Sequence, residues 1–133
     1  NQKRHGDRLS LIMFDIDHFK AVNDTYGHDI GDKVLIEMSN FVKTLIREND
    51  YLFRVGGEEF IIILSDTNIE EGKFVSEKIC KEVSELQMVE GEKITISIGL
   101  TEVESGDTED SIYKKVDSLL YFSKKNGKNR VST

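Results

Sequence analysis

The sequence YLFRVGGEEFIIIL at residues 51–64 places two apolar, β-branched runs on either side of a Gly-Gly-Glu-Glu break. A glycine-centred break between two strand-like runs is typical of a β-hairpin. Upstream, residues 9–14 read LSLIMF, a short and mostly apolar run that predicts a buried strand. This strand ends in Asp15-Ile16-Asp17. If the hairpin lies beside it, Asp15 meets Glu58 and Glu59 of the hairpin turn at one edge of a sheet.

Three helices are expected around these strands. Apolar residues recur at helical spacing from Asp32 to Arg47, which predicts a long amphipathic helix. Asn68 followed by Glu71 resembles a capping box, which would open a second helix. A third helix near the C-terminus has two lysines in its final turn, and Gly127 is placed to end it.

Two further strands complete the expected sheet. Residues 94–103 alternate isoleucine and leucine with serine and threonine, and residues 130–133 are expected to form a short edge strand. The order is therefore strand, helix, hairpin, helix, strand, helix. This order predicts an α/β (α+β) sandwich with a mixed, mostly antiparallel central sheet and surrounding helices.

Length and composition limit the classes of protein to consider. The chain has 133 residues, which suits a single domain, and no apolar run approaches the about 18 residues of a membrane helix. A net charge of -7 argues against binding to a nucleic-acid polymer. Cys80 is the only cysteine, so an internal disulfide and a cysteine-built zinc site are both impossible. We expect a soluble domain in a reducing, cytoplasmic compartment.

Common nucleotide and metal motifs are missing from the sequence. It has no P-loop, no Gly-x-Gly-x-x-Gly after a strand, no His-Glu-x-x-His and no Cys-x-x-Cys. Asp15-x-Asp17 cannot begin an EF-hand, because Phe19 and Lys20 occupy the fifth and sixth positions of the loop.

The acidic residues at the predicted strand end carry the main chemical hypothesis. The carboxylates of Asp15, Glu58 and Glu59, with the backbone carbonyl of Ile16, would form a hard-oxygen site suited to Mg²⁺ that also touches phosphates. The glycine pair 56–57 would let a triphosphate approach the turn. The alternative is that Asp15 merely ends a strand and that the two glutamates form a solvated turn.

Two other groups of polar residues have similarly open interpretations. Asn23, His28 and Asp32 could line one pocket, where an amide and a carboxylate would suit guanine, or they could belong to a turn and a helix start. Basic side chains could hold phosphates or could be ordinary surface cations near helix ends. These cations are Lys20, Lys124 and Lys128.

Five segments together resemble a known family. They are FDIDHFK at 14–20, NDTYGHDIGD at 23–32, RVGGEEF at 54–60, TISIG at 95–99 and DSLLYFSKKNGKN at 117–129. In this order they closely resemble the GGDEF family of diguanylate cyclases, with the signature in its Gly-Gly-Glu-Glu-Phe form. The resemblance runs from about Arg4 to Val131.

The resemblance implies an enzyme that condenses two GTP molecules into cyclic di-GMP and releases two pyrophosphates. It also implies a palm-like sheet, as in class III nucleotide cyclases, and Mg²⁺ (or Mn²⁺) with two ions in each active half-site. Asp15, the Ile16 carbonyl and Glu58 correspond to metal ligands. Glu59 shares the site as a further ligand or deprotonates the 3′-hydroxyl, and Lys20 offsets charge on the reacting phosphates.

The remaining positions of the family pattern concern substrate and product. Asn23 and Asp32 correspond to guanine contacts, and His28 to a further substrate contact. The substrate set also includes four residues near the phosphates, Gly56, Gly57, Lys124 and Lys128. Lysine at 128 stands where the family commonly has arginine, so a point charge replaces a bidentate contact.

Each domain supplies one nucleotide site, so the two-nucleotide product implies a two-fold homodimer. Arg47-Glu48-Asn49-Asp50 lies five residues before Gly56, which matches the Arg-x-x-Asp inhibitory site that binds product in this family. Two alternatives remain open. One is a catalytically idle receptor for cyclic di-GMP, and the other is a cyclase of mixed purine specificity.

The family usually carries a helical stretch with an Asp-x-Leu-Thr signature ahead of the first strand, and residues 1–7 resemble the end of it. We therefore expect residues 1–133 to be a single GGDEF domain from a longer protein. An N-terminal sensory or receiver domain would regulate the full-length protein, which could be attached to a membrane.

Overall fold

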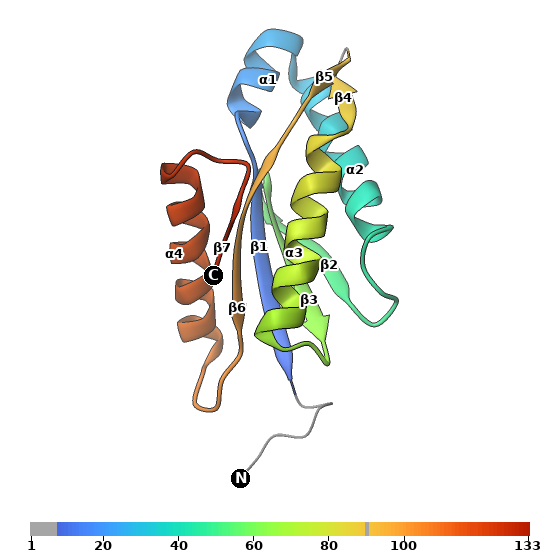
Figure 1. Ribbon diagram of the computed structural model, residues 1–133. Coiled ribbons are helices and arrows are strands. Elements are labelled where there is room, and N and C mark those ends of the chain that lie inside the picture. The colour runs from blue at the N-terminus through green and yellow to red at the C-terminus, as the bar shows by residue number, and fades with distance from the viewer. Residues whose placement is uncertain (1–7, 90) are drawn as a thin grey trace.

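The computed structural model describes residues 8–89 and 91–133. The expected end of a helix at residues 1–7 therefore lies outside the described residues. Five strands form the central sheet in the order β2-β3-β1-β6-β7 (Figure 1). Their bounds are β1 Leu9–Ile16, β2 Tyr51–Gly56, β3 Glu59–Ser65, β6 Ile96–Glu102 and β7 Val131–Ser132. All neighbours are antiparallel except β6 and β7, which confirms the mixed, mostly antiparallel sheet.

The helices lie on both faces of this sheet. Their bounds are α1 Phe19–Tyr26, α2 His28–Lys43, α3 Ile69–Ser84 and α4 Glu109–Lys125. Figure 1 shows α2 and α3 on one side of the sheet and α4 on the other. Successive side chains of a strand point to opposite faces, so β1 serves both layers. Ile12 and Phe14 belong to the large core shared with α2 and α3, and Met13 packs in a smaller cluster with Val116 and Leu120 of α4.

One glycine allows α4 to lie unusually close to the sheet. A Cβ atom on Gly99 of β6 would stand 2.5 Å from the backbone nitrogen of Leu120 and 2.6 Å from the backbone oxygen of Val116. Such distances are shorter than any real Cβ contact, so only glycine permits this packing. The close approach brings the last turn of α4, with Lys124, against the end of β1.

The predicted helix at 32–47 is displaced along the chain. The structure begins α2 at His28 and ends it at Lys43, four residues earlier at each end. Gly27 separates α1 from α2 because its φ of 92° lies outside the helical region. Asp32 therefore sits one turn inside the helix, and Asp29 takes the place of the first-turn acid. The start of α3 agrees better with its prediction, because the expected Asn68–Glu71 capping box is present there.

A short second sheet escaped the sequence prediction. It pairs β4 Gln87–Val89 with β5 Glu92–Lys93. Strands of three and two residues are too short to show a period-2 pattern. None of the helices in the described ranges, 8–89 and 91–133, is long and apolar enough to span a bilayer.

Candidate active site

The end of β1 and the β2–β3 turn meet as the sequence predicted. β1 pairs with β3 so that Asp15 stands opposite Glu59. The backbone N–H of Ile16 also donates to the carbonyl of Glu58, at 3.4 Å. The three acidic residues are therefore held at one end of the sheet by backbone pairing, before any ligand is considered.

Asp15 is a buried carboxylate whose bonding is incomplete. The residue is only 3% exposed. Its Oδ2 is paired with the ammonium group of Lys124, and its Oδ1 has no hydrogen-bond partner among the described residues. Burial raises the pKa of Asp15 to about 6, with Glu58 and Glu59 adding to this and Lys124 opposing it. A nearby cation stabilises the charged form of such a buried carboxylate.

The pKa values of Glu59 and Lys124, which lie near Asp15, also reflect burial and the negative charge of this region. Burial raises the pKa of Glu59, and the charge of Asp117 raises it further while Lys124 lowers it. Burial alone would lower the pKa of Lys124, but the hydrogen bond and charge of Asp15 outweigh it, so the pKa is raised. Lys124 is thus firmly charged and acts as a counter-ion for Asp15.

The donor set fits a hard divalent cation, although it is not assembled as a metal cage. Carboxylate oxygens are the ligands that Mg²⁺ prefers, and an unpaired buried oxygen on Asp15 offers one such ligand. Within the described part of the chain, no three acidic, histidine or cysteine side chains are grouped closely enough to hold a metal on their own. In this structure Lys124 stands beside Asp15 instead.

A cleft of about 310 Å³ opens at this end of the sheet. Its lining includes Asp15 and Glu58, but not Glu59, and three lysines of the predicted site. The lining residues are Asp15, Ile16, Asp17, His18, Phe19, Lys20, Glu58, Lys124 and Lys128. A volume of this size suits a small ligand. The structure therefore unites residues that are more than 100 positions apart in the sequence.

The predicted guanine contacts lie on the helices beside this cleft and are not among its lining residues. Asn23 is on α1, and its side chain lies against Gly31 of α2, where an added Cβ would stand 1.8 Å from its Oδ1. His28 and Asp32 are exposed on α2, one helical turn apart. Lys20 is exposed at the rim and pairs with Asp24 at 3.2 Å. That Asn23 and Asp32 bind guanine, and that His28 is a further substrate contact, stays a prediction.

The glycines of the hairpin turn leave its surface open. Among the described residues, no atom lies within 4 Å of a Cβ built on Gly56 or Gly57. Gly57 also has a φ of 51°, which side chains other than glycine rarely adopt. A ligand could therefore approach the backbone of the turn directly.

Comparison with known proteins decides the family. The model of the family described as "Diguanylate cyclase, GGDEF domain" matches residues 1–130. The chain belongs to the GGDEF family. Diguanylate cyclase A of Treponema denticola is 45% identical over 130 residues, which cover 95% of this chain and 35% of that protein. The chain thus spans about a third of that relative's length.

Two solved structures extend the likeness to three dimensions. The active GGEEF domain of a diguanylate cyclase from Vibrio cholerae has a TM-score of 0.88 at 38% identity, covering 94% of this chain and 81% of that chain. The GGDEF domain of DgcB from Caulobacter crescentus, in complex with c-di-GMP, has a TM-score of 0.87 at 34% identity. That match covers 94% of this chain and 77% of the other. The four-helix, mixed-sheet fold is therefore the GGDEF fold.

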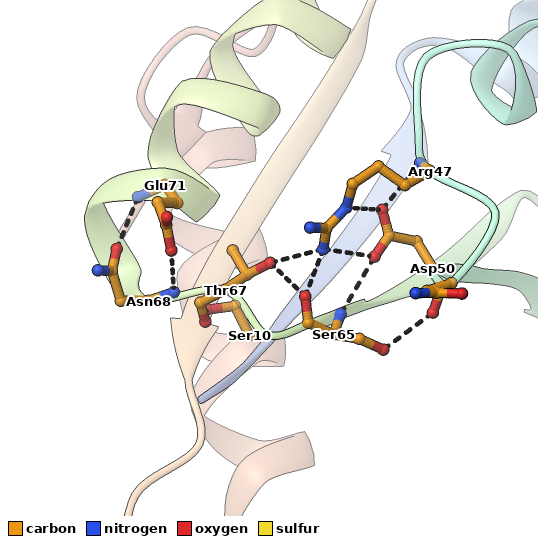
Figure 2. Close-up of polar contacts among 8 residues, drawn as sticks. Ser10, Arg47, Asp50, Ser65, Thr67, Asn68 and Glu71 are labelled. Atoms are coloured by element: carbon orange, nitrogen blue, oxygen red, sulfur yellow. Dashed lines mark hydrogen bonds and ion pairs between the residues drawn. The ribbon is translucent and has the colours of Figure 1, made fainter. Parts of the chain in front are cut away.

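This GGDEF domain has a second polar site at the opposite end of the sheet. The side chain of Asp50 is only 2% exposed and accepts four hydrogen bonds. Three come from Arg47, through its backbone N–H, Nε and Nη2, at 2.9, 3.2 and 3.0 Å. The fourth comes from the backbone N–H of Ser65 at 3.1 Å. The guanidinium of Arg47 also contacts the Ser65 carbonyl and, at 3.0 Å, the hydroxyl of Thr67 (Figure 2).

Sequence reasoning missed the group of residues around Asp17. Asp17 lines the cleft but is only 4% exposed, and it accepts hydrogen bonds from Thr95, Ser97 and the backbone of Asn129. Thr95 and Ser97 were visible only as the polar positions of an alternating strand, and Ser97 is in fact fully buried. A second acid after an apolar strand was the one available signal for this group.

Proposed function

We propose that this GGDEF domain is a diguanylate cyclase, which condenses two GTP molecules into cyclic di-GMP with release of two pyrophosphates. The observation that carries the proposal is the incompletely bonded Asp15, which lies with Glu58 in a cleft that three lysines also line. Negative charge for a metal and positive charge for phosphates meet there, as phosphoryl transfer requires.

Four groups would hold the metal. They are the carboxylates of Asp15, Glu58 and Glu59 and the backbone carbonyl of Ile16. The ion would be Mg²⁺, or Mn²⁺ in its place, with two ions in each half-site. When bound, these ions neutralise the triphosphate and polarise its α-phosphoryl group.

The side chains of the domain perform the remaining work. Lys124, which pairs with Asp15 in this structure, would bind the phosphates together with Lys128. Lys20 offsets charge on the reacting phosphates from the rim of the cleft. Glu59 accepts the proton of the 3′-hydroxyl or acts as a further ligand. Asn23 and Asp32 bind the guanine edge, and His28 is a further substrate contact.

The product contains two nucleotides, whereas each domain offers one such site. We therefore propose a two-fold homodimer in which each protomer presents one GTP to the other. We also propose that the domain belongs to a longer, cytoplasmic or membrane-attached protein with an N-terminal sensory or receiver domain. Regulation would then control whether the two protomers come together with their active sites facing each other.

The Arg47–Asp50 site is proposed to bind cyclic di-GMP as an inhibitor. The DgcB GGDEF structure in complex with c-di-GMP supports product recognition by a domain of this fold. In the present structure the carboxylate of Asp50 already accepts hydrogen bonds from four N–H groups of the protein. The side chain of Arg47 is already 58% exposed, but that of Asp50 is only 2% exposed, so contact between the product and Asp50 would require Arg47 to turn away from it.

A catalytically idle receptor for cyclic di-GMP is the second candidate. The observation in its favour is that the ammonium group of Lys124 stands beside Asp15, where the cyclase would have to place a metal ion. Retention of the acids at positions 58 and 59 favours the enzyme, because a receptor would not need them.

The deciding experiment joins the chain to a dimeric zipper and supplies GTP and Mg²⁺. We expect cyclic di-GMP and pyrophosphate, and we expect Glu58→Gln to abolish both. Glu70→Gln, in the first turn of α3, is the matched control and should keep full activity. Binding of cyclic di-GMP without turnover would establish the receptor, and abundant mixed product from ATP plus GTP would overturn the guanine assignment of Asp32.

A further inference from the structure

Asp17 is a buried acid that has no place in the proposed chemistry. It lies two residues beyond Asp15 but is bonded quite differently. Its Oδ1 accepts from the hydroxyl of Ser97 at 2.6 Å. Its Oδ2 accepts from the hydroxyl of Thr95 at 2.6 Å and from the backbone N–H of Asn129 at 3.0 Å. The carboxylate therefore joins the end of β1 to the start of β6 and to the turn that follows α4.

That turn has an unusual backbone. Lys128 and Asn129 both have left-handed conformations, with φ values of 61° and 48°. A left-handed backbone is unfavourable for lysine, less so for asparagine, and persists only where the surroundings hold it. The backbone N–H of Lys128 donates to the Ser123 carbonyl at 3.0 Å, which ties the turn to α4. The bond from Asn129 to Asp17 ties the other side of the turn to β1.

The position of Lys128 depends on this turn. Lys128 lines the cleft together with Asp15 and Glu58. Arg130 supports the same backbone, since its Nε donates to the Lys128 carbonyl at 3.2 Å. A lysine contributes to phosphate binding where its backbone places the flexible side chain within reach of the phosphates.

We propose that Asp17 is a positioning residue for the phosphates of the substrate. It holds the left-handed turn at 128–129, and through this turn it places Lys128 in the cleft beside Asp15. The inference rests on the proposed function, because it takes the cleft to be the triphosphate site. Asp17 is thereby distinguished from Asp15, although the two form one Asp-x-Asp pair in the sequence.

The bonding of Asp17 also indicates which substitution should preserve the role. The side chain is needed as an acceptor for Thr95 and Asn129. An asparagine can keep its carbonyl oxygen there and turn its NH₂ group toward the hydroxyl of Ser97, which can accept a hydrogen bond. Asp17→Asn should therefore retain the turn, whereas Asp17→Ala removes the acceptor altogether.

A double-mutant cycle between Asp17→Ala and Lys128→Ala tests the proposal. The measurement is the dissociation constant of a slowly reacting GTP analogue, GTPαS, in the presence of Mg²⁺. We expect each single variant to weaken binding about tenfold and the double variant to be no weaker than either, because both changes remove the same contact. Asp17→Asn should bind within about twofold of the wild type. Ser10→Ala, which removes a buried hydroxyl at the other end of β1, is the control and should bind normally.

Two results would overturn the proposal. Additive effects, with about a hundredfold loss in the double variant, would show that Asp17 acts independently of Lys128. A loss with Asp17→Asn as large as with Asp17→Ala would show that the site needs the charge of Asp17 rather than its acceptors. If Asp17→Ala does not fold, Thr95→Val replaces it in the cycle. A threefold loss that disappears in the Lys128→Ala background supports the proposal, and no loss overturns it.

Binding and turnover separate this inference from the proposed function. If the dimerised wild type binds GTPαS with the expected coupling but forms no cyclic di-GMP, the cyclase assignment fails and the role of Asp17 stands. If it forms product while the coupling is absent, the role of Asp17 fails and the cyclase assignment stands.

Discussion

Two buried aspartates lie at opposite ends of the same sheet and differ in how completely they are bonded. Asp15 stands opposite Glu59 at one end of the β1–β3 pair, while Ser65, which bonds to Asp50, stands opposite Leu9 at the other. Asp50 accepts four N–H groups, whereas Asp15 has one cationic partner and an oxygen with none among the described residues. The complete network stabilises the fold, and the incomplete one leaves capacity for a ligand.

Replacing Asp15 should separate these two roles most clearly. We expect Asp15→Asn to lower the rate of cyclic di-GMP formation at least a hundredfold, an effect of about 3 kcal/mol, because a metal ligand is lost. The free energy of unfolding should not fall by more than about 1 kcal/mol, because burial already acts against the charged form of this residue. Product assays and urea denaturation measure the two effects, and a large loss of stability with retained activity would contradict the comparison.

Replacing Asp50 should have the converse effect on stability. In Asp50→Asn the new NH₂ group must face N–H donors wherever it points, so two of the four hydrogen bonds are lost. We expect the free energy of unfolding to fall by about 2 to 3 kcal/mol. Asp110→Asn, on the surface of α4, is the control and should change it by less than about 0.5 kcal/mol. Equal effects of the two variants on urea denaturation would show that the Asp50 network contributes little.

The reactivity of the Cys80 thiol can be used to test how tightly the active-site end of the molecule is packed. Burial, together with the nearby charges of Asp17 and Glu77, raises the pKa of its thiol to about 11. Its Sγ lies 3.6 Å from the Oδ1 of Asn129, in the turn that carries Lys128. Below that pKa the thiol is mostly protonated, so alkylation of the native protein at pH 8 should be at least about tenfold slower than in urea. Rapid alkylation of the native chain would show that this turn opens easily.

The smallest expected effect concerns the Arg47 network. Thr67→Val keeps the shape of the side chain but removes a hydroxyl that accepts a hydrogen bond from the Nη2 of Arg47 at 3.0 Å. We expect cyclic di-GMP to bind about threefold more tightly, because Arg47 then leaves Asp50 more easily. Thr44→Val, at the end of α2, is the control and should leave this affinity unchanged. Titration calorimetry gives both constants, and weaker binding to Thr67→Val would mean that Arg47 is already placed for the product.

Local patterns were enough to predict much of this structure. The hairpin at 51–64 and the strand at 9–14 predicted that Asp15, Glu58 and Glu59 would meet, and the register confirms it. The Asn68–Glu71 capping box was equally readable. The bounds of α2 were missed because that helix begins after Gly27, whose φ of 92° separates it from α1, four residues before the apolar periodicity indicated a start.

The sequence by itself determined the strands of the central sheet, three of the four helices and the pairing of acids at the hairpin, because these follow from periodicity and turn chemistry within a few residues. It did not predict α1 or the short sheet of β4 and β5. Only the tertiary structure decided how completely each acid is hydrogen-bonded. Asp15 and Asp17 are two residues apart and look alike in the sequence, yet the partners of Asp17 lie 78, 80 and 112 residues away. Hydrogen bonds of that range depend on how the sheet and α4 pack, so one carboxylate is fully bonded and its neighbour remains available to a ligand.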